Sequence, residues 1–161
     1  MFFCLRNTLE LDAARPVSDM AAFFGYQLAP SAALTLTLAR EHGCVSACLQ
    51  DAEQSFAASE PCSEAAASGE VTRCVKLVVL KVFAELTGLQ PKLPWGILTG
   101  VRPTKLAHKL LDGGVEAAAL PEYLSENYLL PLPQGRLLTD IALKQKHILS
   151  DSTRLSDTGI Y

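Results

Sequence analysis

The sequence predicts an α+β fold: a small antiparallel sheet of about three strands with two helices, followed by a small three-helix unit. Three observations predict it. Residues 34–40 alternate strictly between apolar and polar side chains, which is typical of a half-buried strand. Residues 70–88 carry apolar side chains at helical spacing. Three segments after residue 100 show further helix signals. We therefore expect an α+β domain over 1–90 and a helical unit over 91–150.

Strands are expected in the first third of the chain. The segment FFCLRNTLEL at 2–11 alternates loosely between apolar and polar residues and suits a strand. LTLTLAR at 34–40 and CVSACLQ at 44–50 flank the short turn EHG at 41–43. Two alternating runs separated by a Gly-containing turn predict a β-hairpin.

Two helices and one loop complete the predicted N-terminal domain. The first helix spans 16–25, because Pro16 suits its first turn and Gly25 suits its C-terminal cap. Residues 51–69 are rich in Ala, Ser and Glu without a steady period, so we expect a flexible loop. The second helix spans 70–88 and should be the most buried, because its apolar stripe is wide.

The C-terminal part predicts three helices. The first spans 103–112 and stops at a Gly-Gly pair. The second lies within 116–129 and is disturbed by Pro121. The third spans 134–149, with one face expected to hold Leu137, Leu138, Ile141, Gln145, Ile148 and Leu149. Residues 151–161 are mostly polar and predict a linker.

Composition excludes several classes of protein. The chain has 161 residues, of which 49% are hydrophobic and 19% charged, with a net charge of -3. It therefore suits a globular protein that buries a core, and its apolar runs are too short for a membrane span. The N-terminus lacks the pattern of a signal peptide, so we expect a cytoplasmic protein. Residues 91–161 hold eight basic and seven acidic residues, which does not favour nucleic-acid binding.

The five cysteines predict neither a disulfide framework nor a metal site. They lie at 4, 44, 48, 62 and 74, and no CxxC occurs. Cys44 and Cys48 are the nearest pair, but on a strand they would be more than ~13 Å apart. We therefore expect all five to be reduced, small apolar residues.

One connection, PWGILTGVRPTKL at 94–106, carries more special residues than a linker needs. Trp95 beside Gly96 predicts a large ring packed against close backbone, so we expect a structural role for Trp95. Thr99 or Arg102 can cap the following helix, and Pro103 suits its first turn. The segment also contains Gly100, and we interpret Trp95, Gly96, Thr99, Gly100 and Pro103 as one structural motif.

The helix at 103–112 should have a basic face. Leu106, Ala107, Leu110 and Leu111 fall on one side of a helical wheel, and Arg102, Lys105 and Lys109 fall on the other. Basic side chains near free helix N-terminal amides favour an anion site or a surface that docks an acidic domain. Plain solvated surface is the alternative interpretation, to which His108 also belongs.

A family resemblance rests on LPWGILTGVRPTKL, the segment EYLSENYLL and the helix containing IALKQKHIL. These residues resemble the N-terminal region of the oxygen-independent coproporphyrinogen III oxidase-like radical S-adenosylmethionine proteins of the HemZ type. The resemblance covers about 70–161 well and 1–50 in layout. It implies an accessory domain of a tetrapyrrole-pathway oxidoreductase that converts coproporphyrinogen III to protoporphyrinogen IX, and a linker that leads into a catalytic barrel absent from this chain.

The same resemblance implies that the catalytic residues lie elsewhere. In the family a CxxxCxxC motif binds a [4Fe–4S] cluster for use with S-adenosylmethionine; CVSAC at 44–48 has only its first spacing. We therefore expect no catalytic residue, cofactor or metal in this chain. Its expected partners are its own barrel and a tetrapyrrole. A helix-turn-helix-like nucleic-acid-binding or interaction domain is the alternative from another class.

Overall fold

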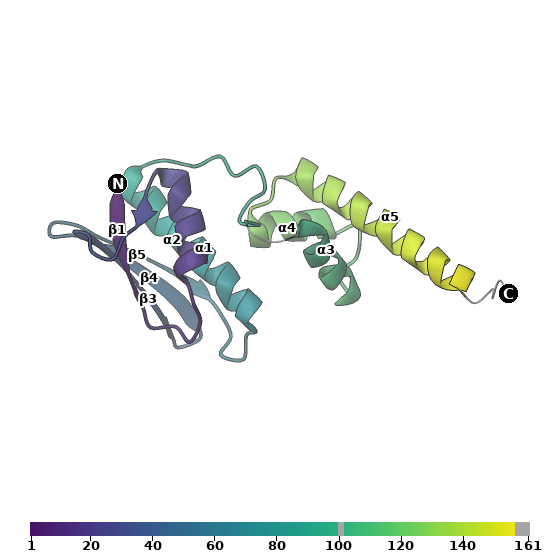
Figure 1. Cartoon of the computed structure of the whole chain (residues 1–161), viewed down its shortest axis with the longest axis horizontal. Coiled ribbons are helices and arrows are strands. Elements are labelled where there is room, and N and C mark those ends of the chain that lie inside the picture. The colour runs from purple at the N-terminus through teal and green to yellow at the C-terminus, as the bar shows by residue number, and fades with distance from the viewer. Residues whose placement is uncertain (100–101, 157–161) are drawn as a thin grey trace. The chain divides into compact units, whose positions relative to one another are not determined.

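The computed structural model describes residues 1–99 and 102–156, although the side chains of 149–156 are not described. The chain divides into two compact units, Met1–Lys92 and Leu93–Tyr161 (Figure 1). The first unit is an α+β structure and the second is helical.

The first unit contains one five-stranded sheet with the order β2-β1-β3-β4-β5. Its strands are β1 (Phe2–Asn7), β2 (Gln27–Leu28), β3 (Leu34–Glu41), β4 (Cys44–Gln50) and β5 (Ser55–Pro61). β1 is parallel to both β2 and β3, whereas β3, β4 and β5 form an antiparallel meander. The fold class is thus confirmed, but the sheet is mixed and larger than the predicted antiparallel sheet of about three strands.

The two strands that the sequence pattern missed have weak signals. β2 is only two residues long, so no periodicity can reveal it. β5 has the sequence SFAASEP, which is dominated by small residues of modest strand propensity. The segment 51–69, which we expected to be a loop, therefore contains a strand that pairs with β4 over its whole length.

The predicted hairpin is confirmed. β3 and β4 are joined through His42 and Gly43, whose φ angles are 53° and 73°. Positive φ at both central residues is the geometry that matches the twist of the flanking strands, and Gly adopts it without strain. His42 adopts it at a cost, since a side chain with a Cβ disfavours this region.

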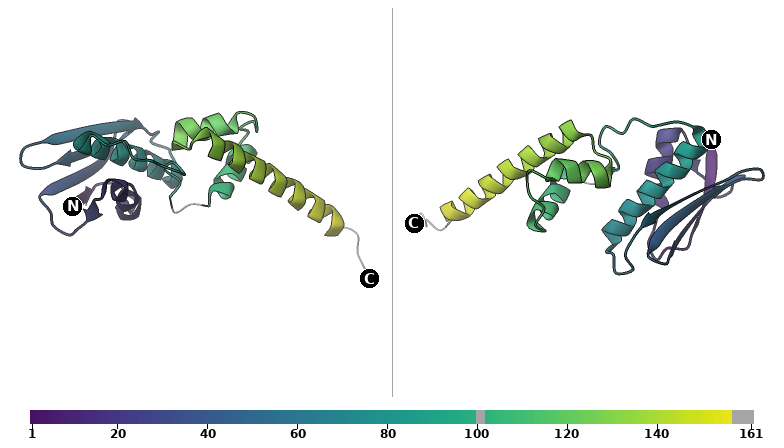
Figure 2. Two further views of the ribbon diagram at one scale, coloured as in Figure 1. Left: turned by 90° about the horizontal axis from the view of Figure 1, so that it is seen from above. Right: turned by 180° about the vertical axis from the view of Figure 1, so that it is seen from behind.

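Helices cover one face of the sheet and leave the other face open (Figure 2). They are α1 (Ala14–Ala21), the 3₁₀ turn η1 (Ala22–Phe24) and α2 (Ser68–Thr87). As predicted, Gly25 and Gly88 follow the helices in the left-handed conformation. The ring of Phe83 on α2 packs against Phe3, Phe24 and Tyr26, which anchors α2 to β1 and to the end of α1.

The second unit contains α3 (Pro103–Asp112), α4 (Leu120–Tyr128) and α5 (Leu132–Ser156). Its core is formed by Leu98, Ala107, Leu120, Leu124, Leu130, Leu138 and Ala142. α3 matches the predicted helix. Pro121 is the second residue of α4 and does not disturb the helix, because Pro suits the first turn of a helix. α5 extends through 151–156, which we expected to be linker; 157–161 lie outside the described residues.

The buried face of α5 differs from the expected one. Leu138, Thr139 and Ala142 are buried, whereas Leu137 and Ile148 are 52% and 66% exposed. The apolar residues of α5 are spread around the helix, so spacing alone did not identify the side that packs on α3 and α4. Over the described part of the chain, no helix combines the length and apolar character that crossing a membrane requires.

Candidate functional site

The segment that precedes α3 is locked to the junction between α4 and α5. Gly96 has a φ of 55°, and a Cβ atom at this position would lie 2.1 Å from the carbonyl oxygen of Tyr128. The next residue, Ile97, donates its backbone N–H to that same oxygen at 2.9 Å. Ile97 and Leu98 are buried. The glycine is therefore required both by its backbone conformation and by the close approach.

Trp95 is not the buried anchor that the sequence predicts. Its side chain is 44% exposed, although its carbonyl oxygen accepts a hydrogen bond from Leu98 at 3.1 Å. The packing against close backbone is performed by Gly96 and Ile97 instead. Leu129, on the other side of this contact, is 42% exposed and has a φ of 54°, which is uncommon for a residue with a side chain.

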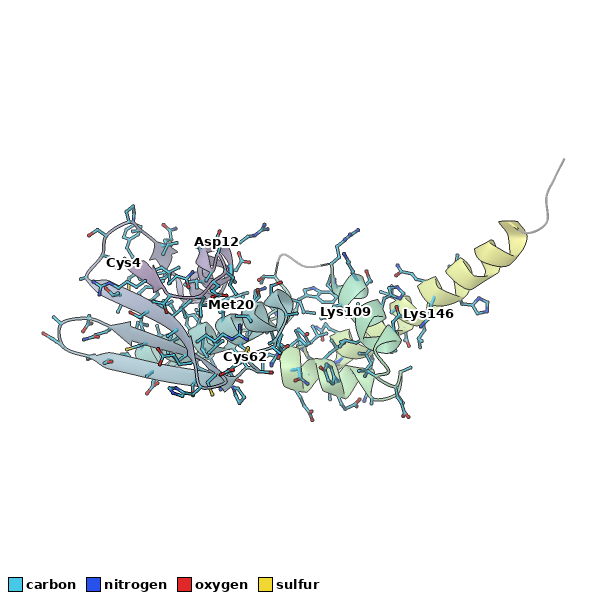
Figure 3. The ribbon with its side chains drawn as sticks, turned by 90° about the horizontal axis from the view of Figure 1, so that it is seen from below. Cys4, Asp12, Met20, Cys62, Lys109 and Lys146 are labelled. Carbon is cyan, nitrogen blue, oxygen red and sulfur yellow. The ribbon has the colours of Figure 1, made fainter. Side chains whose placement is uncertain are left out.

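The predicted basic residues lie at the start of α3 and on its exposed side. Arg102 occupies the N-cap position with extended backbone, and Pro103 is the first helical residue. The Arg102 side chain makes no capping hydrogen bond at this helix end, so the predicted capping by Arg102 is not observed. Arg102, Lys105 and Lys109 are all exposed, and Figure 3 labels Lys109. Gly100, the remaining residue of the predicted motif, lies outside the described residues.

Polar contacts tie the end of α3 to α5. Lys146 donates to the Asp112 carboxylate at 2.7 Å, and the His108 ring lies 3.0 Å from the Gln145 side-chain oxygen. The hydrogen bond from Lys146 lowers the pKa of Asp112, and the positive charge of Lys146 lowers it further. The structure thus pairs Asp112 with Lys146 of α5, a contact that sequence reasoning did not predict.

The cysteines are distributed over both faces of the sheet. All five are free. Cys44 and Cys48 lie on β4 in the alternating positions that face away from the helices. Cys62 and Cys74 are buried neighbours between the end of β5 and α2, which sequence spacing did not reveal. Burial raises the pKa of the Cys74 thiol to about 12, and the Cys62 thiol adds to the shift against the opposing charge of Arg73.

A second position that sequence reasoning missed is Lys76, which is 5% exposed within α2. Burial lowers its pKa, while the negative charge of Asp19 on α1 opposes that effect. The sequence did hold a signal, because Lys76 precedes Leu80 and Phe83 by four and seven residues and so shares their helix face. The aliphatic part of a Lys side chain can occupy such a face.

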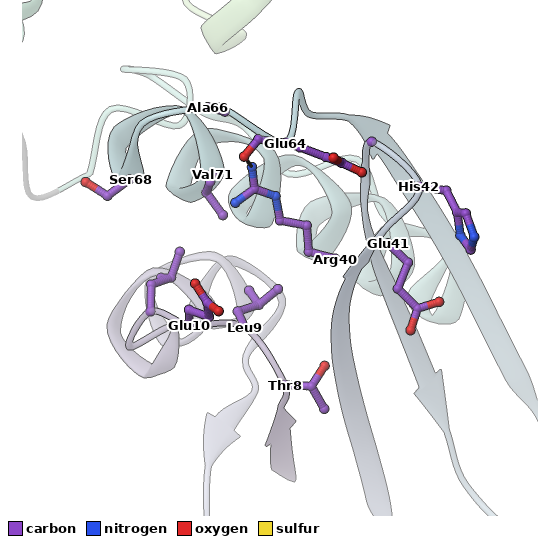
Figure 4. Close-up of a pocket in the computed structure, with 12 residues that line it drawn as sticks. Thr8, Leu9, Glu10, Arg40, Glu41, His42, Glu64, Ala66, Ser68 and Val71 are labelled. Carbon is purple, nitrogen blue, oxygen red and sulfur yellow. Dashed lines mark hydrogen bonds between the residues drawn. The ribbon is translucent and has the colours of Figure 1, made fainter.

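A cavity of the first unit has a volume of about 500 Å³ and lies at one end of the sheet (Figure 4). It is bordered by the connection from β1 to α1, the β3–β4 turn and the start of α2. Arg40 reaches across to the carbonyl oxygens of Ser63 and Glu64 at 2.5 and 2.8 Å. Glu10, Glu41 and Glu64 also line the cavity. Arg40 therefore fastens the segment before α2 to β3.

Among the side chains that the structure describes, in residues 1–99 and 102–148, no three of His, Cys, Asp or Glu are grouped closely enough to hold a metal ion.

Comparisons with known proteins relate the chain to one named protein. No family model matches the chain. No solved structure matches it either. The curated oxygen-independent coproporphyrinogen-III oxidase-like protein HemZ of Bacillus subtilis (strain 168) is 34% identical over 95 residues. The match covers 59% of this chain but only 19% of HemZ. The chain is thus similar to one part of a HemZ-type, oxygen-independent coproporphyrinogen-III oxidase-like protein, which confirms the predicted resemblance.

Proposed function

We propose that this chain is an accessory region of a longer radical S-adenosylmethionine oxidoreductase of tetrapyrrole biosynthesis. That enzyme would convert coproporphyrinogen III to protoporphyrinogen IX. The observation that carries the proposal is the 34% identity to HemZ. Because the match covers only 19% of that relative, most of its length has no counterpart here, and the reaction is assigned to regions beyond this accessory part.

The cysteines of this chain do not fit the cluster that the resemblance implies. A [4Fe–4S] cluster of this family is held by the three closely spaced thiolates of CxxxCxxC. Here Cys44 and Cys48 lie on a strand. Cys62 and Cys74 are buried, and the other cysteines lie far from them in the sequence. The cluster and S-adenosylmethionine therefore belong, in this proposal, to another part of the longer protein.

The role that we propose for this region is to brace the catalytic barrel through the basic face of α3. Arg102, Lys105 and Lys109 are exposed, and α3 packs into its unit through the opposite side, where Ala107 is fully buried. Acidic residues of the barrel would be their partners. The carboxylates of a tetrapyrrole are a second candidate for the same face, since Lys and Arg bind carboxylates well.

A helix-turn-helix-like nucleic-acid-binding role is not favoured. The eight basic residues of 91–161 are matched by seven acidic ones. Such a balance gives little of the positive field that steers a protein to nucleic acid.

An anaerobic assay of the complete polypeptide tests the proposed reaction. With S-adenosylmethionine and a reductant present, the complete protein should convert coproporphyrinogen III, and the 161-residue chain alone should bind no cluster and convert nothing. A complete protein that holds its cluster and cleaves S-adenosylmethionine but leaves this substrate unchanged would contradict the substrate assignment.

Charge reversal tests the accessory role. Lys105→Glu combined with Lys109→Glu in the complete protein should weaken the contact with the barrel and lower activity, while the isolated chain stays folded. Arg136→Glu with Lys144→Glu is a matched control, because both side chains are exposed on α5 and the change in net charge is equal. Equal activities of the two double variants would show that the basic face of α3 is ordinary solvated surface.

A further inference from the structure

The outer edge of β5 is unpaired. β5 is the last strand of the sheet, and no strand of residues 1–99 and 102–156 pairs with its outer side. The backbone N–H of Cys62 donates to the carbonyl oxygen of Gly43, and that of Asp51 donates to the carbonyl oxygen of Gln54. These two bonds identify which opposite residues of β4 and β5 are hydrogen-bonded to each other. Hydrogen-bonded pairs recur at every second residue of an antiparallel ladder.

This alternation decides which residues of β5 direct their backbone N–H and C=O groups away from β4. Phe56, Ala58 and Glu60 lie opposite Leu49, Ala47 and Val45 in the register and exchange hydrogen bonds with them. Ser55, Ala57 and Ser59 therefore direct their N–H and C=O groups away from β4, toward the open edge. Three donors and three acceptors are thus presented in one row.

The edge has few of the devices that usually prevent pairing. Edge strands are commonly protected by a Lys, an inward charge, a bulge or a central Pro. The three outward residues are uncharged and small, and the charge of Glu60 is directed to Lys81 on α2. Pro61 stands only at the end of the strand. The edge therefore remains available to another strand.

We propose that β5 pairs with β5 of a second copy of this chain, antiparallel and around a twofold axis at Ala57. The outward residues read Ser-Ala-Ser in both directions, so this axis sets Ala57 opposite Ala57 and Ser55 opposite Ser59. Each of the three pairs exchanges two backbone hydrogen bonds, about six in total. The smallest side chain stands on the axis, where the two copies approach most closely.

The intervening residues favour a second copy over an unrelated strand. In the same register, half-buried Phe56 faces Ala58 of the second copy, so an apolar pair forms on each side of the axis. Glu60 faces Gln54 of the second copy, and no like charges oppose one another. The result is one continuous sheet of two five-stranded halves, with an isologous interface.

Sedimentation of the 161-residue chain tests the proposal. The average mass should rise from the 17.3 kDa of one chain toward twice that value between low and high micromolar concentration. A reductant is included, because Cys48 lies beside Ser55. Ala57→Lys places two like charges on the axis and should weaken the dimer by about tenfold or more. Thr37→Lys on β3 is the control with the same charge change and should dimerise like the parent.

Hydrogen exchange supplies a second measurement that does not depend on a variant. The amides of Ser55, Ala57 and Ser59 should gain protection as concentration rises, whereas those of Phe56 and Ala58 should be protected throughout. A monomer at every concentration, or equal weakening by Thr37→Lys, would overturn the proposal. Concentration-independent protection of the outward amides would also overturn it, since it would show that the edge is covered within one chain.

Discussion

The backbone of Gly96 lies so close to Tyr128 that a Cβ atom would stand 2.1 Å from the Tyr128 carbonyl oxygen. The carbonyl carbon and oxygen of Leu129 would lie within 2.8 Å of the same Cβ. All three neighbours are backbone atoms, which cannot rotate away as a side chain can. The connection before α3 and the junction of α4 and α5 therefore behave as one structural element.

Gly96→Ala should destabilise the second unit by about 3 kcal/mol or more, because it adds a left-handed residue and a clash with backbone. Gly114→Ala is the control, since Gly114 has a φ of 95° but open space around its Cβ position. Gly114→Ala should lower the free energy of unfolding by only about 1–2 kcal/mol, the cost of the left-handed backbone conformation for a residue with a Cβ atom. Denaturant unfolding followed by circular dichroism measures both values. Equal losses would show that the contact at Gly96 can relax.

Trp95→Ala should destabilise the chain by about 1–2 kcal/mol, less than a buried Trp would lose, because the ring is 44% exposed. Trp95 is the only Trp of the chain, so its fluorescence reports on this site alone. The emission should be quenched by a soluble quencher in the folded protein. Emission at short wavelength that resists quenching would contradict the partly exposed position.

Cys74 should make the first unit less stable at alkaline pH. Its folded pKa is raised to about 12, so the neutral thiol is favoured in the folded state. The contribution to stability is complete below the unfolded pKa of about 9 and is lost as pH rises toward the folded value. Unfolding free energies from pH 8 to pH 11 should fall less steeply in Cys74→Ala than in the parent, by at most about 1.4 kcal/mol per pH unit.

Cys48→Ala is the control for this titration, because Cys48 lies on the open face of the sheet. A thiol reagent should also label Cys48 well before Cys74 in the folded protein. Rapid labelling of Cys74 under native conditions would contradict its burial.

The Asp112–Lys146 pair should appear in a titration of Asp112. The hydrogen bond from Lys146 holds the pKa of Asp112 below its ordinary value, so Lys146→Gln should raise that pKa. Asp112 thus favours folding above its unfolded pKa, and this effect is lost as pH falls through the lower folded pKa. NMR titration measures the shift, with Lys144→Gln as the control. If Lys146→Gln left the Asp112 pKa unchanged, the ion pair between Asp112 on α3 and Lys146 on α5 would be contradicted.

Sequence periodicity predicted the long elements and missed those with little side-chain contrast. The apolar stripe of α2 and the alternation of β3 each involve many residues, so the pattern stays recognisable even where single residues depart from it. β5 is paired along its whole length, yet its small residues give no clear contrast between faces. The parallel pairing of β1 is also invisible in a single strand, because alternation is the same for both strand directions.

At the candidate site, residue types were easier to predict than their surroundings. The need for Gly96 and Pro103 was visible, since both residues have distinctive backbone requirements. The exposure of Trp95 was not, because Gly96 and Ile97 make the contact with the α4–α5 junction, which lies more than thirty residues later. The partner of Asp112 was likewise missed, since Lys146 is brought near only by the packing of α3 on α5.

The contact between Phe3 and Phe83, with ring centroids 5.3 Å apart, has a consequence for synthesis on the ribosome. β1 emerges first, but one partner strand, β3, begins at Leu34 and the covering helix α2 ends only at Thr87. The local meander of β3, β4 and β5 can form before α2 is complete, whereas β1 must wait for non-local contacts. Phe3 should therefore stay accessible to chaperones until the last turn of α2 has left the exit tunnel.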